Sequence, residues 1–236
     1  MGPIYRREMK AYFQTPSGYV FIFTFLFISG LFFSLFNILS NSSNLNQTLQ
    51  SVWFLLLFIF MVPILTMRLL SDERKAKTDQ LLLTSPLSVW SIVIGKFLAA
   101  CTMLIITLGL TGIYVLILSI ISEPAMTEGL VTYLGFFLMG CCFVAVGTLL
   151  SAISENQVTT YVTTVGTLLA IFLLNFVIPY LNVPVVPEVL GWLSMFKRYD
   201  DLAMGVLGLS SVVYMISFCV LFIFFAVRSI DRRRWI

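Results

Sequence analysis

Residues 67–96 read MRLLSDERKAKTDQLLLTSPLSVWSIVIGK and form a long polar interval between two strongly apolar stretches. The interval contains a dense block of mixed charge, in which six charged residues fall within eight positions: Asp72, Glu73, Arg74, Lys75, Lys77 and Asp79. The sequence on both sides is apolar enough to lie in lipid. We therefore expect this segment to be where a membrane protein contacts a component outside the membrane.

The composition of the chain indicates an all-α, polytopic membrane protein. Of its 236 residues, 59% are hydrophobic and only 11% are charged, and the mean hydropathy is +1.01. Soluble proteins contain about 25% charged residues, so a soluble core does not account for this much apolar surface. The four cysteines lie inside apolar runs and there is no histidine, so neither a disulfide nor a metal site is predicted.

Six stretches are long and apolar enough to cross a membrane, which requires about 20 residues each. They are 18–38, 51–70, 96–121, 129–152, 158–179 and 207–228. The connections between them are too short to hold a soluble domain. The sequence therefore predicts one membrane domain over residues 1–236, with six transmembrane helices.

Two further segments are expected to lie at the membrane surface. Residues 3–14 place apolar side chains on one helical face and Arg6, Arg7 and Lys10 at its rim, which favours an amphipathic surface helix over a frayed basic tail. Residues 180–206 are too apolar for a solvated loop and contain two prolines. We expect this segment to form short re-entrant or surface helices between spans five and six.

Lysine and arginine are distributed unequally between the two ends of the predicted helices. Twelve of them flank the N-terminus, the 67–96 interval and the C-terminus, whereas only Lys197 and Arg198 fall on the opposite side. Cytoplasmic segments of membrane proteins carry this excess of basic residues. Both termini and the 67–96 interval are therefore predicted to be cytoplasmic.

Several features inside the spans allow two interpretations. Pro63 in span two permits either a hinge or a static kink. In span four, Gly135, Gly140 and Gly147 allow close helix packing, for which packing within one subunit is favoured over contact between subunits. Span five carries a polar stripe with two interpretations. It could line a transport pathway, or its threonines could donate hydrogen bonds to carbonyls of their own helix. The stripe consists of Thr160, Thr164, Thr167 and Asn175.

The sequence lacks the residues of an energy-converting or catalytic site. There is no histidine for acid–base chemistry, and Gly95-Lys96 is not preceded by the glycine of a phosphate-binding loop. No span carries a charge at its centre, which argues against a proton relay. We therefore predict that the chain is not an enzyme, and that a partner supplies the energy if it transports uphill.

The charged interval has the features of a docking element. Asp72 and Glu73 favour the start of a helix that could extend to about Leu83, and Ser85-Pro86 can begin another. Leucines give these helices an apolar side that could dock in a cleft of a cytoplasmic protein. A solvated basic loop against lipid headgroups is the alternative, and the residues alone leave both open.

Four stretches of the sequence resemble the permeases of ABC-2 type exporters. The resemblance rests on SDERKAKTDQLLLTSPLSVWSIVIGKFLAA (71–100), IYRREMKAYFQTPSGYVFIFTFLFISGLFF (4–33), GTLLSAISENQ (147–157) and YDDLAMGVLGLSSVVYMISF (199–218), followed by the RRRW ending. It covers nearly the whole chain and is closest to short six-span permeases related to gliding-motility and copper-enzyme-maturation transporters. Many relatives have Gly-Thr where this chain has Lys77-Thr78.

The resemblance implies the membrane subunit of an ATP-driven exporter in a bacterial cytoplasmic membrane. Such a permease pairs with a second copy or a paralogue and with two cytoplasmic ATPase subunits. These partners bind ATP and Mg²⁺, and no cofactor or nucleic acid is expected on this chain. A non-transporting membrane scaffold that recruits a cytoplasmic partner is the alternative. The substrate cannot be read from the sequence.

The resemblance also assigns roles to particular segments. Residues 3–14 would be a connecting helix, 72–92 a cytoplasmic coupling segment with its ATPase-contacting helix at 72–84, and 180–206 the outer re-entrant segment. The implied ATPase-coupling residues are Asp72, Glu73, Arg74, Thr78, Leu81, Leu82, Leu83 and Glu155. The implied pathway-lining residues on spans two and five are Pro63, Thr160, Thr164, Thr167 and Asn175.

Overall fold

A computed structural model describes residues 2–40, 46–75, 88–121, 126–177 and 194–233. These residues form helices, and no strand occurs among them. The helices are α1 (Gly2–Gln14), α2 (Pro16–Phe33), which continues into the π-helix η1 (Ser34–Ile38), α3 (Asn46–Gln50), α4 (Val52–Thr66), α5 (Ser71–Lys75), α7 (Val89–Ile121), α8 (Met126–Ile153), α9 (Gln157–Val177), α11 (Met195–Ala203) and α12 (Leu209–Arg233). The all-α prediction is confirmed for the described part of the chain.

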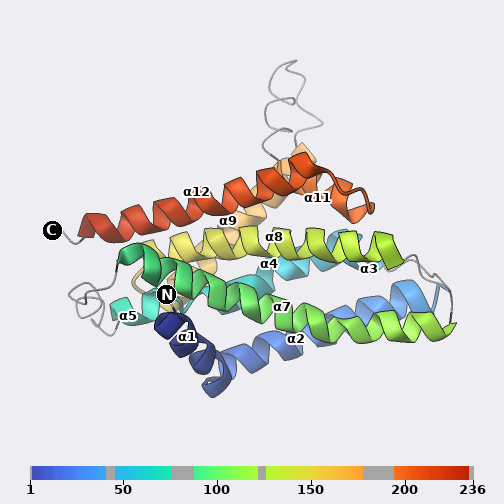
Figure 1. The fold of residues 1–236 in the computed structure, drawn as a ribbon, viewed down its shortest axis with the longest axis horizontal. Coiled ribbons are helices and arrows are strands. Elements are labelled where there is room, and N and C mark those ends of the chain that lie inside the picture. Colours follow the sequence, from blue (N-terminus) through green and yellow to red (C-terminus); the bar gives the residue numbers. More distant parts are fainter. Residues whose placement is uncertain (1, 41–45, 76–87, 122–125, 178–193, 234–236) are drawn as a thin grey trace, which may run out of the picture.

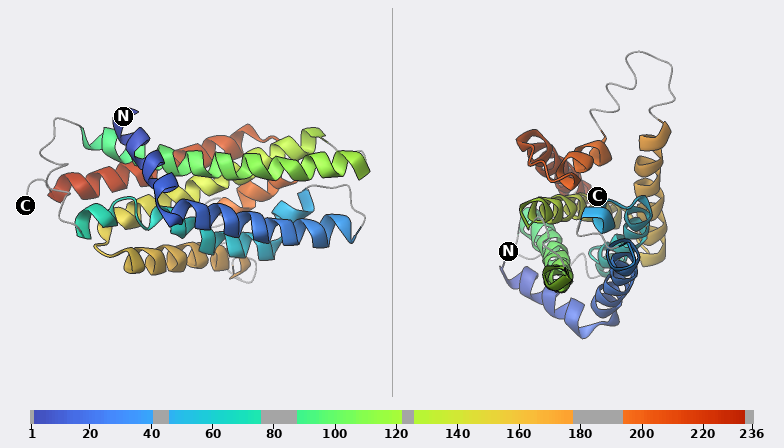
Figure 2. Two further views of the ribbon diagram at one scale, coloured as in Figure 1. Left: turned by 90° about the horizontal axis from the view of Figure 1, so that it is seen from below. Right: turned by 90° about the vertical axis from the view of Figure 1, so that its right-hand side faces the viewer.

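The long helices α2, α4, α7, α8, α9 and α12 run along the long axis of one bundle (Figure 1). The N-terminus, α5 and the C-terminal end of α12 lie toward one end of the bundle, whereas α3 and α11 lie toward the other. Figure 2 shows α1 crossing the bundle at an angle to α2. Helices α1 and α5 and the C-terminal end of α12 thus lie toward the same end of the bundle.

Among the described residues, five helices are long and apolar enough to cross a membrane. They are Pro16–Ile38, Val89–Ile120, Thr127–Ile153, Gln157–Val177 and Leu209–Arg232, and they coincide with five of the six predicted spans. The remaining predicted span, 51–70, contains α4, which has 15 residues and is therefore about 22 Å long. The hydrocarbon core of a bilayer is about 30 Å thick, so by its own length α4 is short for a span.

Helix α8 forms the centre of the bundle. Within its most apolar 18-residue window 72% of the residues are buried, against 22–33% in the other four candidate spans. Phe136 and Phe143 of α8 are fully buried, and their rings pack at tilted angles against Phe25 of α2 and Phe58 of α4. The other long helices therefore pack around α8 and carry exposed apolar side chains on their outer faces.

The glycines of α8 set how closely its neighbours approach. A Cβ atom on Gly147 would lie 2.2 Å from Thr66 Oγ1, and one on Gly135 would lie 2.7 Å from Leu202 Cβ. Distances under 3.0 Å are essentially never seen for real Cβ atoms. The prediction that these glycines allow close packing within one subunit is confirmed.

Helices α3 and α11 close the end of the bundle opposite the charged interval. Tyr199 of α11 is fully buried, and its hydroxyl donates to the carbonyl oxygen of Leu49 in α3 at 2.9 Å. Helix α11 begins after Ser194, whose hydroxyl accepts from the Lys197 amide. In the predicted re-entrant segment 180–206, α11 covers Met195–Ala203, and residues 178–193 lie outside the described residues.

Candidate functional site at the α4–α5 bend

The charged interval begins at a bend between α4 and α5. Helix α4 ends at Thr66, residues 67–70 form turns, and α5 begins at Ser71. Helix α5 has Asp72 and Glu73 in its first turn and Arg74 and Lys75 in its last, which is the order that the helix dipole favours. The remaining predicted coupling residues, Thr78, Leu81, Leu82 and Leu83, lie outside the described residues.

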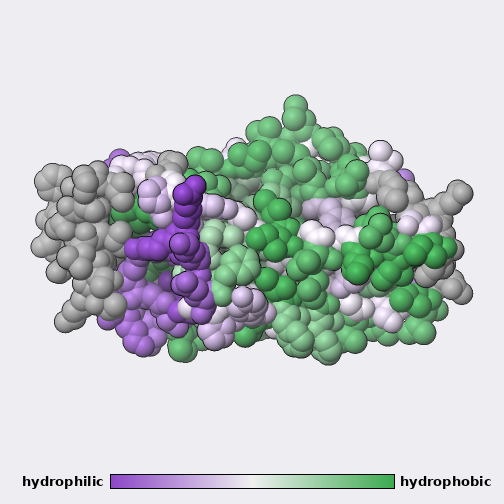
Figure 3. All heavy atoms as spheres, turned by 60° about the horizontal axis from the view of Figure 1, so that its bottom comes forward, coloured by the Kyte–Doolittle hydropathy of each residue, from purple (hydrophilic) through white to green (hydrophobic). Residues whose placement is uncertain are grey.

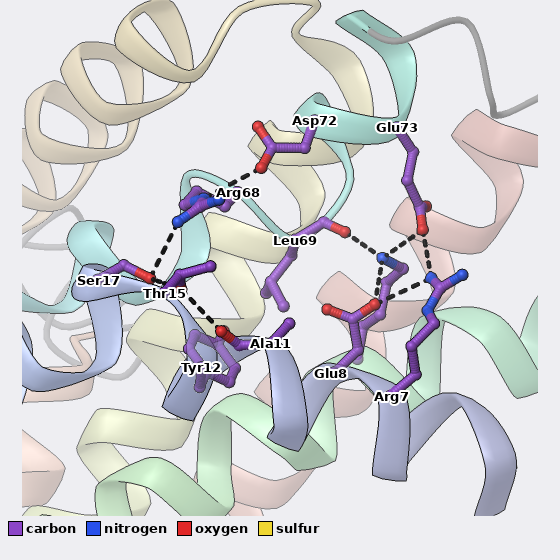
Figure 4. Close-up of a pocket in the computed structure, with 11 residues that line it drawn as sticks. Arg7, Glu8, Ala11, Tyr12, Thr15, Ser17, Arg68, Leu69, Asp72 and Glu73 are labelled. Atoms are coloured by element: carbon purple, nitrogen blue, oxygen red, sulfur yellow. Dashed lines mark hydrogen bonds and ion pairs between the residues drawn. The ribbon is translucent and has the colours of Figure 1, made fainter.

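Four charged side chains from three helices meet beside this bend (Figure 4). They are Arg7 and Glu8 of α1, Glu73 of α5 and Lys96 of α7, and we refer to them as the Lys96 cluster. The Lys96 side chain is only 2% exposed, and its Nζ lies 3.0 Å from Oε1 of Glu8 and 3.0 Å from Oε1 of Glu73. Its third partner is the carbonyl oxygen of Leu69 in the bend. All three N–H donors of the buried ammonium group are therefore used.

Arg7 completes the cluster at its exposed edge. Its Nη2 donates to Glu8 at 3.0 Å and to Glu73 at 2.5 Å, and its side chain is 53% exposed. Partial burial lowers the pKa of Arg7, but the carboxylates of Glu8 and Glu73 more than offset this, so its pKa lies above the usual value. The cluster has two positive and two negative charges, so it is neutral as a whole.

The start of α2 is bonded to the same bend, and the end of α1 is bonded to the last turn of α4. Arg68 donates from Nε to Asp72 at 3.0 Å and from Nη1 to the hydroxyl of Ser17 at 3.2 Å. The Tyr12 hydroxyl donates to the Leu65 carbonyl at 2.8 Å, and burial raises the pKa of this phenol, which keeps it a neutral donor. These side chains line a cavity of about 260 Å³ together with the Lys96 cluster (Figure 4).

Helices α8 and α9 hold the bend from the other side. The buried hydroxyl of Ser151 accepts from the amides of Leu70 and Ser71, at 3.0 and 3.2 Å. Nε2 of Gln157 donates to Asp72, and Arg74 pairs with Glu155 at 2.8 Å. Helix α5 is therefore bonded to α1, α7, α8 and α9. It is also bonded to Glu155 in the turn between α8 and α9.

Hydrophilic residues gather on the face over α1, whereas apolar residues cover most of the rest of that face (Figure 3). Four predicted ATPase-coupling residues, Asp72, Glu73, Arg74 and Glu155, are brought together at this end, each with a partner inside the chain. Sequence analysis did not identify Glu8, Lys96, Ser151 or Gln157 as parts of the site. Lys96 was placed at the edge of span three, but α7 begins at Val89, so Lys96 lies two turns inside a helix. A lysine in this position needs buried partners, which is the signal that could have found it.

The predicted pathway residues do not form one exposed surface in the single chain. Pro63 lies buried inside α4, and Thr160 and Thr164 are buried where α9 packs against the bundle. The hydroxyls of Thr160, Thr164 and Thr167 each donate to the carbonyl four residues earlier, at 2.7–2.9 Å, and for Thr160 this is Asn156, directly before α9. Asn175 is half-buried and accepts from the Ser194 hydroxyl. The threonines thus bond back to their own helix, the second of the two interpretations that the sequence left open.

Comparison with known families identifies the chain from residue 3 to residue 208. This range matches the family model described as ABC-2 type transporter, and it includes α1, the α4–α5 bend and α11. No curated protein matches the chain. The match covers well over half of the 236 residues, and the chain therefore belongs to the ABC-2 type transporter family of membrane proteins.

Proposed function

We propose that the chain is the permease subunit of an ATP-driven exporter, with six membrane-crossing helices. The sixth is α4 together with the turns at 67–70. In this proposal both termini and α5 face the cytoplasm of a bacterium, as the excess of basic residues at that end favours. Two copies of the chain, or this chain and a paralogue, combine with two ATPase subunits that bind ATP and Mg²⁺.

The proposal rests on two observations. The chain belongs to the ABC-2 type transporter family, and α5 is bonded to several other helices of the chain. The ATPase would bind the segment 72–84 and move α5. Because α5 is bonded to α1, α7 and α8 and to the start of α9, its movement would reach helices throughout the bundle. Binding of ATP can shift the permease only if the ATPase contacts the two permease states with different free energies.

The pathway is proposed to run between two permease chains along α4 and α9. Thr167 and Asn175 are half-buried and could face it. Pro63, Thr160 and Thr164 would act from behind the pathway surface, where close packing with α8 sets the positions of both helices.

Coexpression with a candidate ATPase encoded next to the permease gene tests the proposal. We expect the two proteins to copurify, and permease in lipid vesicles to change the rate of ATP hydrolysis. Leu82→Asp, in the predicted contact helix, should weaken the complex by at least about tenfold, because it places a charge in an apolar contact. Leu207→Asp is the matched control, because Leu207 is 60% exposed and follows α11, which lies toward the opposite end of the bundle from α5.

The same experiment separates the exporter from the scaffold. Binding without any effect on ATP hydrolysis would favour the scaffold. If Leu82→Asp and Leu207→Asp bind the ATPase equally well, residues 72–84 are not the contact helix.

A further inference from the structure

We propose that the Lys96 cluster is a latch that holds α5 in the resting position, and that Lys96 is its positioning residue. When the ATPase moves α5, Glu73 leaves the cluster while Lys96, Glu8 and Arg7 stay together. This inference rests on the proposed function, because it requires α5 to move relative to α1 and α7.

The position of Lys96 explains why it can hold α5. Its ammonium group bonds Glu73 on α5 and also the Leu69 carbonyl in the bend that precedes α5. It bonds Glu8 on α1 with its third donor. One buried side chain of α7 thus fixes both the bend and the helix that follows it.

The other ion pairs of α5 side chains are more exposed to solvent. The Arg74–Glu155 pair includes a carboxylate side chain that is 77% exposed, and the Arg68–Asp72 side chains are 33% and 31% exposed. Exposed ion pairs contribute about 0–1 kcal/mol because water and salt screen them. Glu73 is 17% exposed and faces a lysine that is 2% exposed, so its pair is screened least. The pair between Lys96 and Glu73 is therefore the least exposed of the ion pairs that α5 makes.

The arrangement of charges allows the cluster to open without leaving a buried charge unpaired. Glu8 lies 3.0 Å from Lys96 and 3.0 Å from Arg7, so it can neutralise Lys96 after Glu73 has left. Arg7 is 53% exposed and can be solvated. Glu73 lies on a helix of the polar end of the bundle and would move toward water. Opening thus costs the bonds to Glu73, but it does not strand Lys96, which would be far more costly.

A purely structural ion pair would behave differently from a latch when both partners are replaced. Buried ion pairs can often be exchanged for apolar residues of similar size without loss of stability. The double variant Lys96→Met/Glu73→Met removes one positive and one negative charge and leaves Arg7 paired with Glu8. It should recover most of the stability that Lys96→Met loses, although the Leu69 carbonyl still lacks the Lys96 donor, and it lacks the bonds that hold α5.

Hydrogen exchange of the permease alone, in lipid nanodiscs, provides the first measurement. Amides of residues 71–75 should exchange at least about tenfold faster in Lys96→Met and in the double variant, because charged hydrogen bonds to α5 are lost. Lys10→Met is the matched control, since Lys10 is exposed on α1, and it should exchange like the wild type. Thermal unfolding should show Lys96→Met destabilised and the double variant restored.

The permease–ATPase complex provides the second measurement. The change in ATP hydrolysis caused by the permease should fall at least about fivefold in both cluster variants and stay unchanged in Lys10→Met. If the double variant restores slow exchange and full coupling, Lys96 has only a structural role and the proposal is overturned. If the wild-type permease binds no ATPase, the proposed function fails, whereas unchanged exchange at residues 71–75 in Lys96→Met refutes the latch by itself.

Discussion

Replacing Gly147 with alanine should push α4 away from α8 and disturb the bend that carries α5. The added Cβ would lie 2.2 Å from Thr66 Oγ1, 2.7 Å from Thr66 Cβ and 2.9 Å from Thr66 Cγ2. Rotation of the threonine side chain can move Oγ1 and Cγ2, but it cannot move Cβ. The backbones must therefore separate by at least about 0.3 Å to bring the 2.7 Å contact to 3.0 Å.

We expect this overpacking to lower the free energy of unfolding by ~1–3 kcal/mol, as extra methyl groups do in well-packed cores. For a chain of this size that corresponds to a decrease in Tm of roughly 2–12 °C. The separation should also lengthen the bonds from the Leu70 and Ser71 amides to Ser151, one turn beyond Gly147 on α8. Thermal unfolding in nanodiscs measures the first effect, and hydrogen exchange of residues 71–75 measures the second.

Gly112→Ala in α7 is the matched control, because nothing lies within 4 Å of the Cβ that it would add. This variant should be neutral or more stable, since alanine favours helix formation over glycine by ~0.8–1 kcal/mol. Adding Thr66→Gly to Gly147→Ala removes all three close contacts and should restore part of the lost stability. If Gly147→Ala unfolds at the same temperature as Gly112→Ala, the close approach of α4 to α8 does not exist as described.

Three further predictions concern single polar groups. The Thr66 hydroxyl is buried and has no hydrogen-bond partner among the described residues, so Thr66→Val should raise the free energy of unfolding by ~1 kcal/mol. The Thr148 hydroxyl donates to the Val144 carbonyl at 2.7 Å, so Thr148→Val should lower it in the same thermal unfolding experiment. Ser151→Ala removes the acceptor of the buried Leu70 and Ser71 amides, so it should lower the free energy of unfolding by ~1–3 kcal/mol and speed hydrogen exchange at residues 71–75. Exchange equal to the wild type would show that Ser151 does not hold the bend. Burial and the neighbouring Asp201 raise the pKa of Asp200 in α11. This group therefore favours folding at low pH, and its contribution is lost as the pH rises through its folded pKa. When Tm is measured from pH 4 to 7, it should fall less with rising pH in Asp200→Asn than in the wild type.

The membrane helices could be predicted from sequence because run length and hydropathy are local properties. Five of the six predicted spans coincide with helices that are long enough to cross a bilayer. The end of α4 could not be predicted in this way. Residues 67–70 are as compatible with a helix as those before them, but the amides of Leu70 and Ser71 bond Ser151 on another helix. For the Ser71 amide, a hydroxyl 80 residues away in the chain thus replaces the carbonyl that would accept its hydrogen bond in a continuous helix.

The Lys96 cluster was unpredictable for the same reason. Its members come from α1, α5 and α7, and Glu8 and Lys96 are 88 residues apart. Neither residue belongs to a motif, and a lysine near the end of an apolar run ordinarily marks a membrane boundary. Only the packing of α1 against α7 turns that lysine into a buried partner of two carboxylates.

The pairing of the α5 charges changes which residues should contact the ATPase. Sequence analysis assigned that role to Asp72, Glu73 and Arg74, but each of them has a partner inside the chain. Substituting Glu73 should therefore alter the position of α5 and the coupling to ATP hydrolysis while the two proteins still bind. Direct contact should depend on the predicted residues beyond Lys75, such as Leu82. If Glu73→Gln abolishes binding of the ATPase and Leu82→Asp leaves it intact, then Glu73 contacts the ATPase and Leu82 does not.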